Sequence, residues 1–211
     1  MDYERARTRL VDDLARRLGD PRESTLDAMR AAPRHEFVPS ESRSDAYRDQ
    51  PLPIGDGATI SAPHMVAIMV DLLALEPGDR VLEIGTGCGY HAAVTAEVVG
   101  AENVFSVEYG ERLAREARDR LDRLGYEDIS IRLGDGREGW DEQAPYDAAY
   151  LTCAATEFPP AVVEQVRPGG QILAPIGPRG GSQRLVAGTR RADGGLDTED
   201  RGGVRFVEMQ G

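Results

Sequence analysis

The residues with the clearest chemical meaning form a glycine-rich turn at positions 85–89, which reads Gly-Thr-Gly-Cys-Gly. An apolar run over 81–84 leads into this turn, and a helical pattern over 90–99 follows it. Glycine lets the backbone bend sharply and approach a ligand closely, and the first amides of a helix point toward a ligand at its N-terminus. The pattern therefore predicts a ligand-binding turn whose contacts are Gly85, Thr86, Gly87 and Gly89.

Two carboxylates near the turn indicate what kind of ligand it binds. Glu83 lies inside the preceding run, and Glu108 ends the next strand-like run at the spacing where a carboxylate accepts from ribose hydroxyls. A turn that holds a pyrophosphate reads G-x-G-x-x-G, whereas this one reads G-x-G-x-G. Glu83 would repel a phosphate and attract the ammonium and sulfonium groups of S-adenosylmethionine. We therefore expect S-adenosylmethionine rather than a dinucleotide, with Glu83 and Glu108 among its contacts.

A second short turn, Gly134-Asp135-Gly136, follows the strand-like run 129–133. Ligands of parallel sheets bind outside the carboxyl ends of the strands, so this turn is expected beside the first one. Asp135 is then placed to accept from an adenine amino group, with Gly136 next to it. The same tripeptide is at least as common in turns that bind nothing.

The segment 59–64 reads Thr-Ile-Ser-Ala-Pro-His and precedes a helical pattern that runs to Leu73. Spacing alone favours Ser61 as the cap of that helix, with Pro63 in its first turn. A serine hydroxyl is also suited to orienting a substrate carboxylate. His64, taken alone, is more often a structural histidine than a catalytic one.

The elements that must position these residues follow from hydrophobic periodicity. Apolar spacing predicts helices over 3–18 and 22–31, and the stretch 33–53 reads as a long ordered loop. From residue 80 onward, strands alternate with helices, which predicts an α/β fold with a Rossmann-like, doubly wound, mostly parallel sheet. Strands over 183–189 and 203–209, separated by the turn 192–195, are expected to add an antiparallel edge. We expect one compact domain, in which residues 1–78 supply helices and the segment around Ser61, and residues 79–211 form the ligand-binding core.

Composition limits the partners and the compartment. The 211-residue chain has a net charge of −12, and all 25 of its basic residues are arginines. An acidic surface disfavours nucleic acid and anionic membranes as partners, and acidity without lysine resembles proteins of salt-loving archaea. Neither an apolar run of about 18 residues nor an apolar leader is visible. Cys88 and Cys153 lack metal-ligand or redox spacing, so we expect reduced thiols in the cytoplasm, a monomer, and no metal site.

Four groups of segments resemble the protein-L-isoaspartate (D-aspartate) O-methyltransferases, and together they span most of the chain in that family's order. The first is the Pro-Arg-His-Glu-Phe-Val-Pro run at 33–39 with 46–47 and 51–55, and the second is 58–65, around Ser61. The others are the turn region 81–92, and 134–147 with 165–177. The resemblance implies a class I S-adenosylmethionine-dependent methyltransferase that methylates the free carboxylate of L-isoaspartyl or D-aspartyl residues in damaged proteins, initiating repair. It makes Ser61 the active-site serine, with Thr59, Ile60 and His64 beside it at the substrate.

The chain departs from the family pattern at three places. Glu208 stands where the family usually has a proline, Val66 stands where some relatives have a second histidine, and 151–157 is less rich in alanine and proline. Two alternatives therefore stay open. One is a paralogue that methylates another aspartyl carboxylate or a different acceptor, and the other is a non-catalytic adaptor that binds the cofactor or modified proteins.

Overall fold

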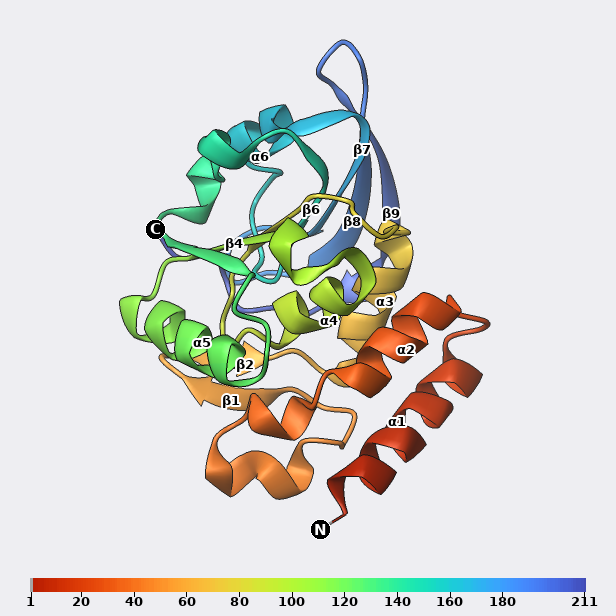
Figure 1. Cartoon of the computed structure of the whole chain (residues 1–211). Coiled ribbons are helices and arrows are strands. Elements are labelled where there is room, and N and C mark those ends of the chain that lie inside the picture. Colours follow the sequence, from red (N-terminus) through yellow and green to blue (C-terminus); the bar gives the residue numbers. More distant parts are fainter. Residues whose placement is uncertain (1) are drawn as a thin grey trace.

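The computed structural model describes residues 2–211 and is built around a seven-stranded sheet (Figure 1). The strands lie in the order β5-β4-β3-β6-β7-β8-β9. Their bounds are β3 Val81–Ile84, β4 Val104–Glu108, β5 Ser130–Leu133, β6 Tyr146–Leu151, β7 Val166–Ile176, β8 Gln183–Arg190 and β9 Leu196–Val204. The first five strands in this order, from β5 to β7, pair in parallel, while β8 and β9 are antiparallel. This arrangement confirms the expected doubly wound sheet with an antiparallel edge.

The chain reverses its direction of winding at β3, which pairs with β4 on one side and with β6 on the other. Such a switch point opens a crevice at the carboxyl ends of the strands, where ligands of these folds bind. The helices that connect the strands are α4 Tyr90–Val99, α5 Glu111–Arg123 and α6 Pro160–Gln165. Short 3-10 turns lie at Ala101–Asn103, Gly136–Glu138 and Asp141–Gln143.

Alternating residues of the central strands enter two different cores, as side chains of a strand must. Val81 packs into a large core with α1 to α5, whereas Leu82 and Ile84 pack into a smaller core with α6 on the opposite face. The sheet is therefore covered on both faces, which explains why β3 and β4 are buried at every position.

The N-terminal segment forms helices α1 Tyr3–Arg17 and α2 Glu23–Ala31, then 3-10 turns Arg34–Glu36 and Ser40–Asp45, and helix α3 Pro63–Leu73. In Figure 1, α1 and α2 lie side by side, and α2 packs against α3 and α4. The buried face of α1 consists of Leu10, Val11 and Leu14, which belong to the same core as α4. The first 78 residues thus fold onto the sheet rather than apart from it.

Two sequence-based boundaries are wrong. The final strand is β9, 196–204, not 203–209, because its polar residues pair along an exposed edge and show no hydrophobic alternation. The expected loop 33–53 ends inside a hairpin of β1 Leu52–Gly55 and β2 Ala58–Ile60. Its turn has positive φ at Gly55, Asp56 and Gly57 (95°, 50° and 73°). Among residues 2–211, no helix is long and apolar enough to cross a membrane.

Candidate active site

The glycine turn joins β3 to α4 with a backbone that only glycine adopts easily. Gly85, Gly87 and Gly89 have φ of 99°, 56° and 87°, in the left-handed region that disfavours other residues. A Cβ on Gly85 would lie 2.4 Å from the Thr152 hydroxyl, and a Cβ on Gly136 would lie 2.3 Å from an Ile84 methyl. At both turns, the absence of a side chain lets the backbone pack closely against its neighbours.

A cavity of about 310 Å³ opens at the carboxyl ends of β3, β4 and β6. Of the predicted cofactor residues, Gly85, Thr86, Gly87, Glu108 and Gly136 line it. Its wall contains three carboxylates, on Asp56, Glu108 and Glu208, and no arginine lines it among the described residues. In a chain with 25 arginines, this wall favours a cationic ligand over a phosphate.

Glu108 holds the turn and also faces the cavity. Its carboxylate accepts from the Gly87 amide and from the Gly110 amide, both at 2.8 Å. Each carboxylate oxygen has a second lone pair, so Glu108 keeps capacity to accept from a ligand hydroxyl while it fixes the backbone around it.

Glu83 differs from the expectation that it binds the cationic part of the ligand. Its side chain is fully buried and does not line the cavity. The Ser106 hydroxyl donates to it at 2.5 Å and the Tyr150 hydroxyl at 3.0 Å. Burial raises the pKa of Glu83 to about 8, so it is protonated at neutral pH and offers no charge to a ligand. The reason is strand alternation: Leu82 and Ile84 point to the face that α6 covers, and Glu83 points to the opposite face, which α4 covers.

Asp135 and Gly89 also lie outside the cavity wall. The Asp135 carboxylate accepts from the Arg137 amide at 2.9 Å and pairs with the Arg137 guanidinium at 3.2 Å, so local contacts occupy it. Gly89 begins α4, and a Cβ there would lie 3.1 Å from a Leu121 methyl, so this glycine serves helix packing.

Ser61 does not cap α3, contrary to the expectation from spacing. The cap position is Ala62, and the α3 amide of His64 instead donates to Asp49 at 2.9 Å. Ser61 lies one residue too early, which leaves its side chain free of the helix.

A second hollow, a groove of about 540 Å³ that we call the acceptor groove, adjoins the cavity. Thr59, Ser61, Thr152 and Val207 line both spaces, so Ser61 lies at their junction. Ile60 lines only the cavity and His64 only the groove. The predicted segment 59–64 therefore lies at the junction of the two spaces.

Several wall residues were not foreseen. Cys88, His91 and Cys153 line the cavity, and burial lowers the pKa of His91 to about 3. The tail 207–210 also lines it, because it pairs with Ala154 instead of continuing the sheet edge. The apolar alternation over 203–209 is the available sequence signal, but it predicts a strand and not a cavity wall.

This fold and this cavity together define a class I S-adenosylmethionine-dependent methyltransferase: a switch point at β3, a glycine turn after it, and a carboxylate that ends the next strand. The family model for protein-L-isoaspartate(D-aspartate) O-methyltransferase matches residues 5–211. The chain belongs to this family.

Individual relatives agree with the assignment. A protein-L-isoaspartate O-methyltransferase 2 of Archaeoglobus fulgidus is 47% identical over 100% of this chain and 95% of its own. A protein-L-isoaspartate O-methyltransferase of Methylorubrum extorquens is 47% identical over 99% of this chain and 90% of its own.

Solved structures show the same fold. A protein-L-isoaspartate O-methyltransferase matches with a TM-score of 0.88 and 31% identity, over 97% of this chain and 66% of its own. A Plasmodium falciparum structure, described as a putative protein-L-isoaspartate O-methyltransferase in complex with S-adenosyl-L-homocysteine, matches with a TM-score of 0.85. Its identity is 24%, over 97% of this chain and 98% of its own.

Proposed function

We propose that the 310 Å³ cavity binds S-adenosylmethionine and that the acceptor groove binds an isoaspartyl peptide, with Ser61 between them. The protein is a methyltransferase that uses S-adenosylmethionine to methylate the free carboxylate of L-isoaspartyl or D-aspartyl residues. The observation that carries the site assignment is the position of Ser61, which lines both spaces and does not cap its helix.

The cofactor supplies a methyl group on a cationic sulfonium, and the cavity suits that charge. Glu108 is placed to accept from the ribose, and Gly85, Thr86 and Gly87 bring backbone close to the ligand. Glu208 adds negative charge to the wall, a role that the sequence had suggested for Glu83, while Asp56 in the same wall is paired with Arg112 at 3.0 Å. Asp135 and Gly89 support this site through their turns rather than by contact.

The acceptor carboxylate needs no strong base, since carboxyl groups titrate near pH 4 and are ionised at neutral pH. The protein's task is to place that carboxylate beside the methyl group. The Ser61 hydroxyl donates to the carboxylate in this proposal, with Thr59 and Ile60 beside it. Val207 and Phe206 in the groove limit its contact with water.

We further propose that residues 1–78 supply the active-site segment around Ser61 and that residues 79–211 supply the glycine turn and Glu108, while residues from both parts line each of the two spaces. The partners are isoaspartyl-containing peptides and proteins, and the net charge of −12 argues against nucleic acid and anionic membranes. Two free cysteines at the cavity suit the cytoplasm. We also propose a monomer that is adapted to high salt, on the basis of the arginine-only acidic composition.

The variant Ser61→Ala tests the site assignment. It should lower kcat/KM for an isoaspartyl peptide about 10- to 100-fold, because it removes a hydrogen bond to a charged group. Cofactor affinity, measured by calorimetry, should stay near that of the wild type. Ser44→Ala is the matched control, since Ser44 is exposed and lines neither space. Wild-type turnover in Ser61→Ala would show that the serine is structural.

A further inference from the structure

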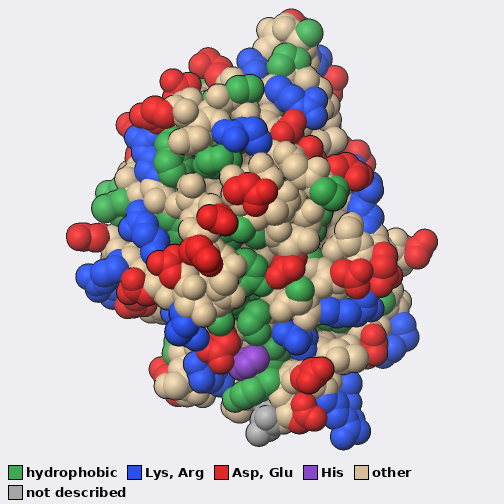
Figure 2. Space-filling model, in the orientation of Figure 1, with side chains coloured by type: hydrophobic (Ala, Val, Ile, Leu, Met, Phe, Trp, Pro, Cys, Tyr) green, Lys and Arg blue, Asp and Glu red, His purple; other side chains and the backbone are tan. Residues whose placement is uncertain are grey.

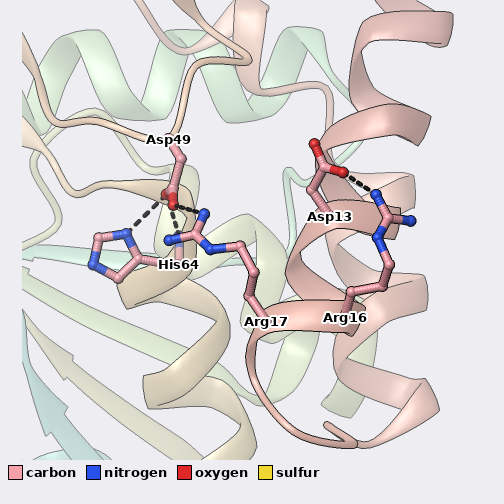
Figure 3. Close-up of polar contacts among 5 residues, drawn as sticks. All are labelled: Asp13, Arg16, Arg17, Asp49 and His64. Atoms are coloured by element: carbon pink, nitrogen blue, oxygen red, sulfur yellow. Dashed lines mark hydrogen bonds and ion pairs between the residues drawn. The ribbon is translucent and has the colours of Figure 1, made fainter.

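Beside the acceptor groove, three residues from distant parts of the chain form a polar cluster that the proposed function does not use (Figure 3). Arg17 comes from the end of α1, Asp49 from the loop before β1, and His64 from the first turn of α3. The Asp49 side chain is 16% exposed. The cluster joins the N-terminal helix to the groove.

Asp49 makes every one of these contacts. Its Oδ1 accepts from the His64 amide at 2.9 Å and from the His64 ring nitrogen Nδ1 at 2.8 Å. Its Oδ2 accepts from Arg17 at 2.7 Å. Burial works to raise the pKa of Asp49, but the hydrogen bonds from His64 and Arg17 outweigh burial and lower it. Because an ionised carboxylate only accepts, Nδ1 of His64 must carry a hydrogen.

The loop that carries Asp49 is itself held in place by the buried side chain of Arg34. Arg34 is fully buried and donates to the Ala46 carbonyl at 2.8 Å and to the Gln50 carbonyl at 3.3 Å. These bonds hold the backbone on both sides of Asp49. The carboxylate is therefore set in place by the fold before any peptide binds.

The ring of His64 lines the acceptor groove, and its second nitrogen points away from Asp49 (Figure 3). In a neutral imidazole with a hydrogen on Nδ1, the other nitrogen is a hydrogen-bond acceptor. Such a lone pair repels a carboxylate and accepts from an amide N–H. His64 is therefore suited to the backbone of the acceptor peptide rather than to its reactive carboxylate.

We infer that Asp49 is a positioning residue for the acceptor: it holds His64 in the Nδ1–H form, so that Nε2 accepts a backbone N–H of the bound peptide. The inference rests on the proposed function, because it names the part of the acceptor that His64 recognises. Recognition of a backbone group suits an enzyme whose groove must take damaged residues in varied sequences.

Asp49→Ala and His64→Phe test the inference. Each should raise KM for an isoaspartyl peptide about tenfold, the size of one lost hydrogen bond, with a much smaller change in kcat. The double variant should be no worse than His64→Phe alone, since the two residues act as a unit. Asp49→Asn keeps an acceptor oxygen and should stay within about twofold of the wild type. Asp13→Asn is the control, because Asp13 pairs with Arg16 on the exposed face of α1 (Figure 3).

Nitrogen-15 NMR of His64 gives a readout that does not depend on turnover. The wild type and Asp49→Asn should show the hydrogen on Nδ1, and Asp49→Ala should show a mixture of tautomers. An unchanged tautomer, an unchanged peptide KM, or additive effects in the double variant would overturn the inference. If the wild type itself methylates no isoaspartyl peptide, the proposed function fails, while the NMR result still decides whether Asp49 sets the tautomer.

Discussion

At the scale of single residues, S-adenosylmethionine is the correct cofactor, but one of the two carboxylates from which it was inferred, Glu83, does not line the cavity. Glu83 is buried in a chain of hydroxyl contacts in which Ser106 also meets Thr86 at 2.5 Å and Tyr150 also meets Thr95 at 3.0 Å. Through Thr86, this series of hydrogen bonds holds the glycine turn in place. The negative charge at the cavity comes from other residues, which strand alternation alone could not reveal.

The variants Glu83→Gln and Glu108→Ala should therefore behave differently. Glu83→Gln should bind S-adenosylmethionine about as well as the wild type, because residue 83 does not touch the cavity. Glu108→Ala should weaken binding by about 1.5–3 kcal/mol for each hydrogen bond lost to a charged group. Calorimetry on folded variants measures both, and a large loss of affinity in Glu83→Gln alone would contradict this placement.

Glu83 also predicts a dependence of stability on pH. Its pKa rises from an ordinary 4.5 to about 8 on folding, because burial disfavours the charged form. The folded state then binds more protons than the unfolded state between these values, so this contribution is full below pH 4.5 and is lost as pH rises through 8. Glutamine does not titrate, so the stability of Glu83→Gln relative to the wild type should increase across this window. Urea unfolding at several pH values measures it, and a constant difference would contradict the assignment.

At the scale of elements, periodicity predicted the helices and the parallel strands well, because each buries a regular apolar face. Periodicity failed where strand pairing, or contacts between residues distant in sequence, determine the local structure. Polar β9 is a strand because it pairs with β8, and Arg184 and Asp200 form an ion pair across the two strands at 2.8 Å. Spacing alone favours Ser61 as the cap of α3, because the carboxylate that accepts from the His64 amide, that of Asp49, is remote in sequence.

The role of the C-terminal segment 205–210, which contains the tail 207–210, is the one that the sequence indicates least. The Gln183 side chain donates to the Phe206 carbonyl at 3.1 Å and accepts from the Phe206 amide at 2.7 Å, which anchors the tail over both spaces. Glu208 accepts from the Gly180 amide at 2.5 Å. Its carboxylate thus anchors the tail and also lines the cavity.

Gln183→Ala should release the tail. Because Val207 lines both spaces, we expect higher KM for both the cofactor and the peptide, and a loss of about 1–3 kcal/mol in stability from unsatisfied backbone groups. Gln171→Ala is the control, since Gln171 lies on β7 and lines neither space. Equal kinetics in the two variants would show that the tail needs no anchor.

At the scale of the whole molecule, the surface mixes both signs of charge but carries an excess of carboxylates, as Figure 2 shows for one face. Many arginines pair with exposed acids, such as Arg30 with Glu23 and Asp27. Exposed pairs of this kind contribute little individually. The excess of negative charge is therefore the larger electrostatic effect on folding.

The protein should lose stability in dilute buffer and regain it in salt. The screening length is about 30 Å at 0.01 M and about 3 Å at 1 M salt, so repulsion among carboxylates acts across the molecule only in the dilute case. Thermal melts followed by circular dichroism should shift upward with salt. Identical cooperative melts at both extremes would contradict the salt-adapted interpretation.

The central claim is methyl transfer from S-adenosylmethionine to an isoaspartyl carboxylate. The most direct measurement incubates the wild-type protein with labelled cofactor and one of three acceptors, at high and low salt. Two acceptors are peptides of the same sequence, one with L-isoaspartate and one with L-aspartate, and the third is RNA. We expect base-labile label on the isoaspartyl peptide and none above background on its aspartyl twin or on RNA. Equal labelling of the two peptides, or labelling of RNA alone, would contradict it.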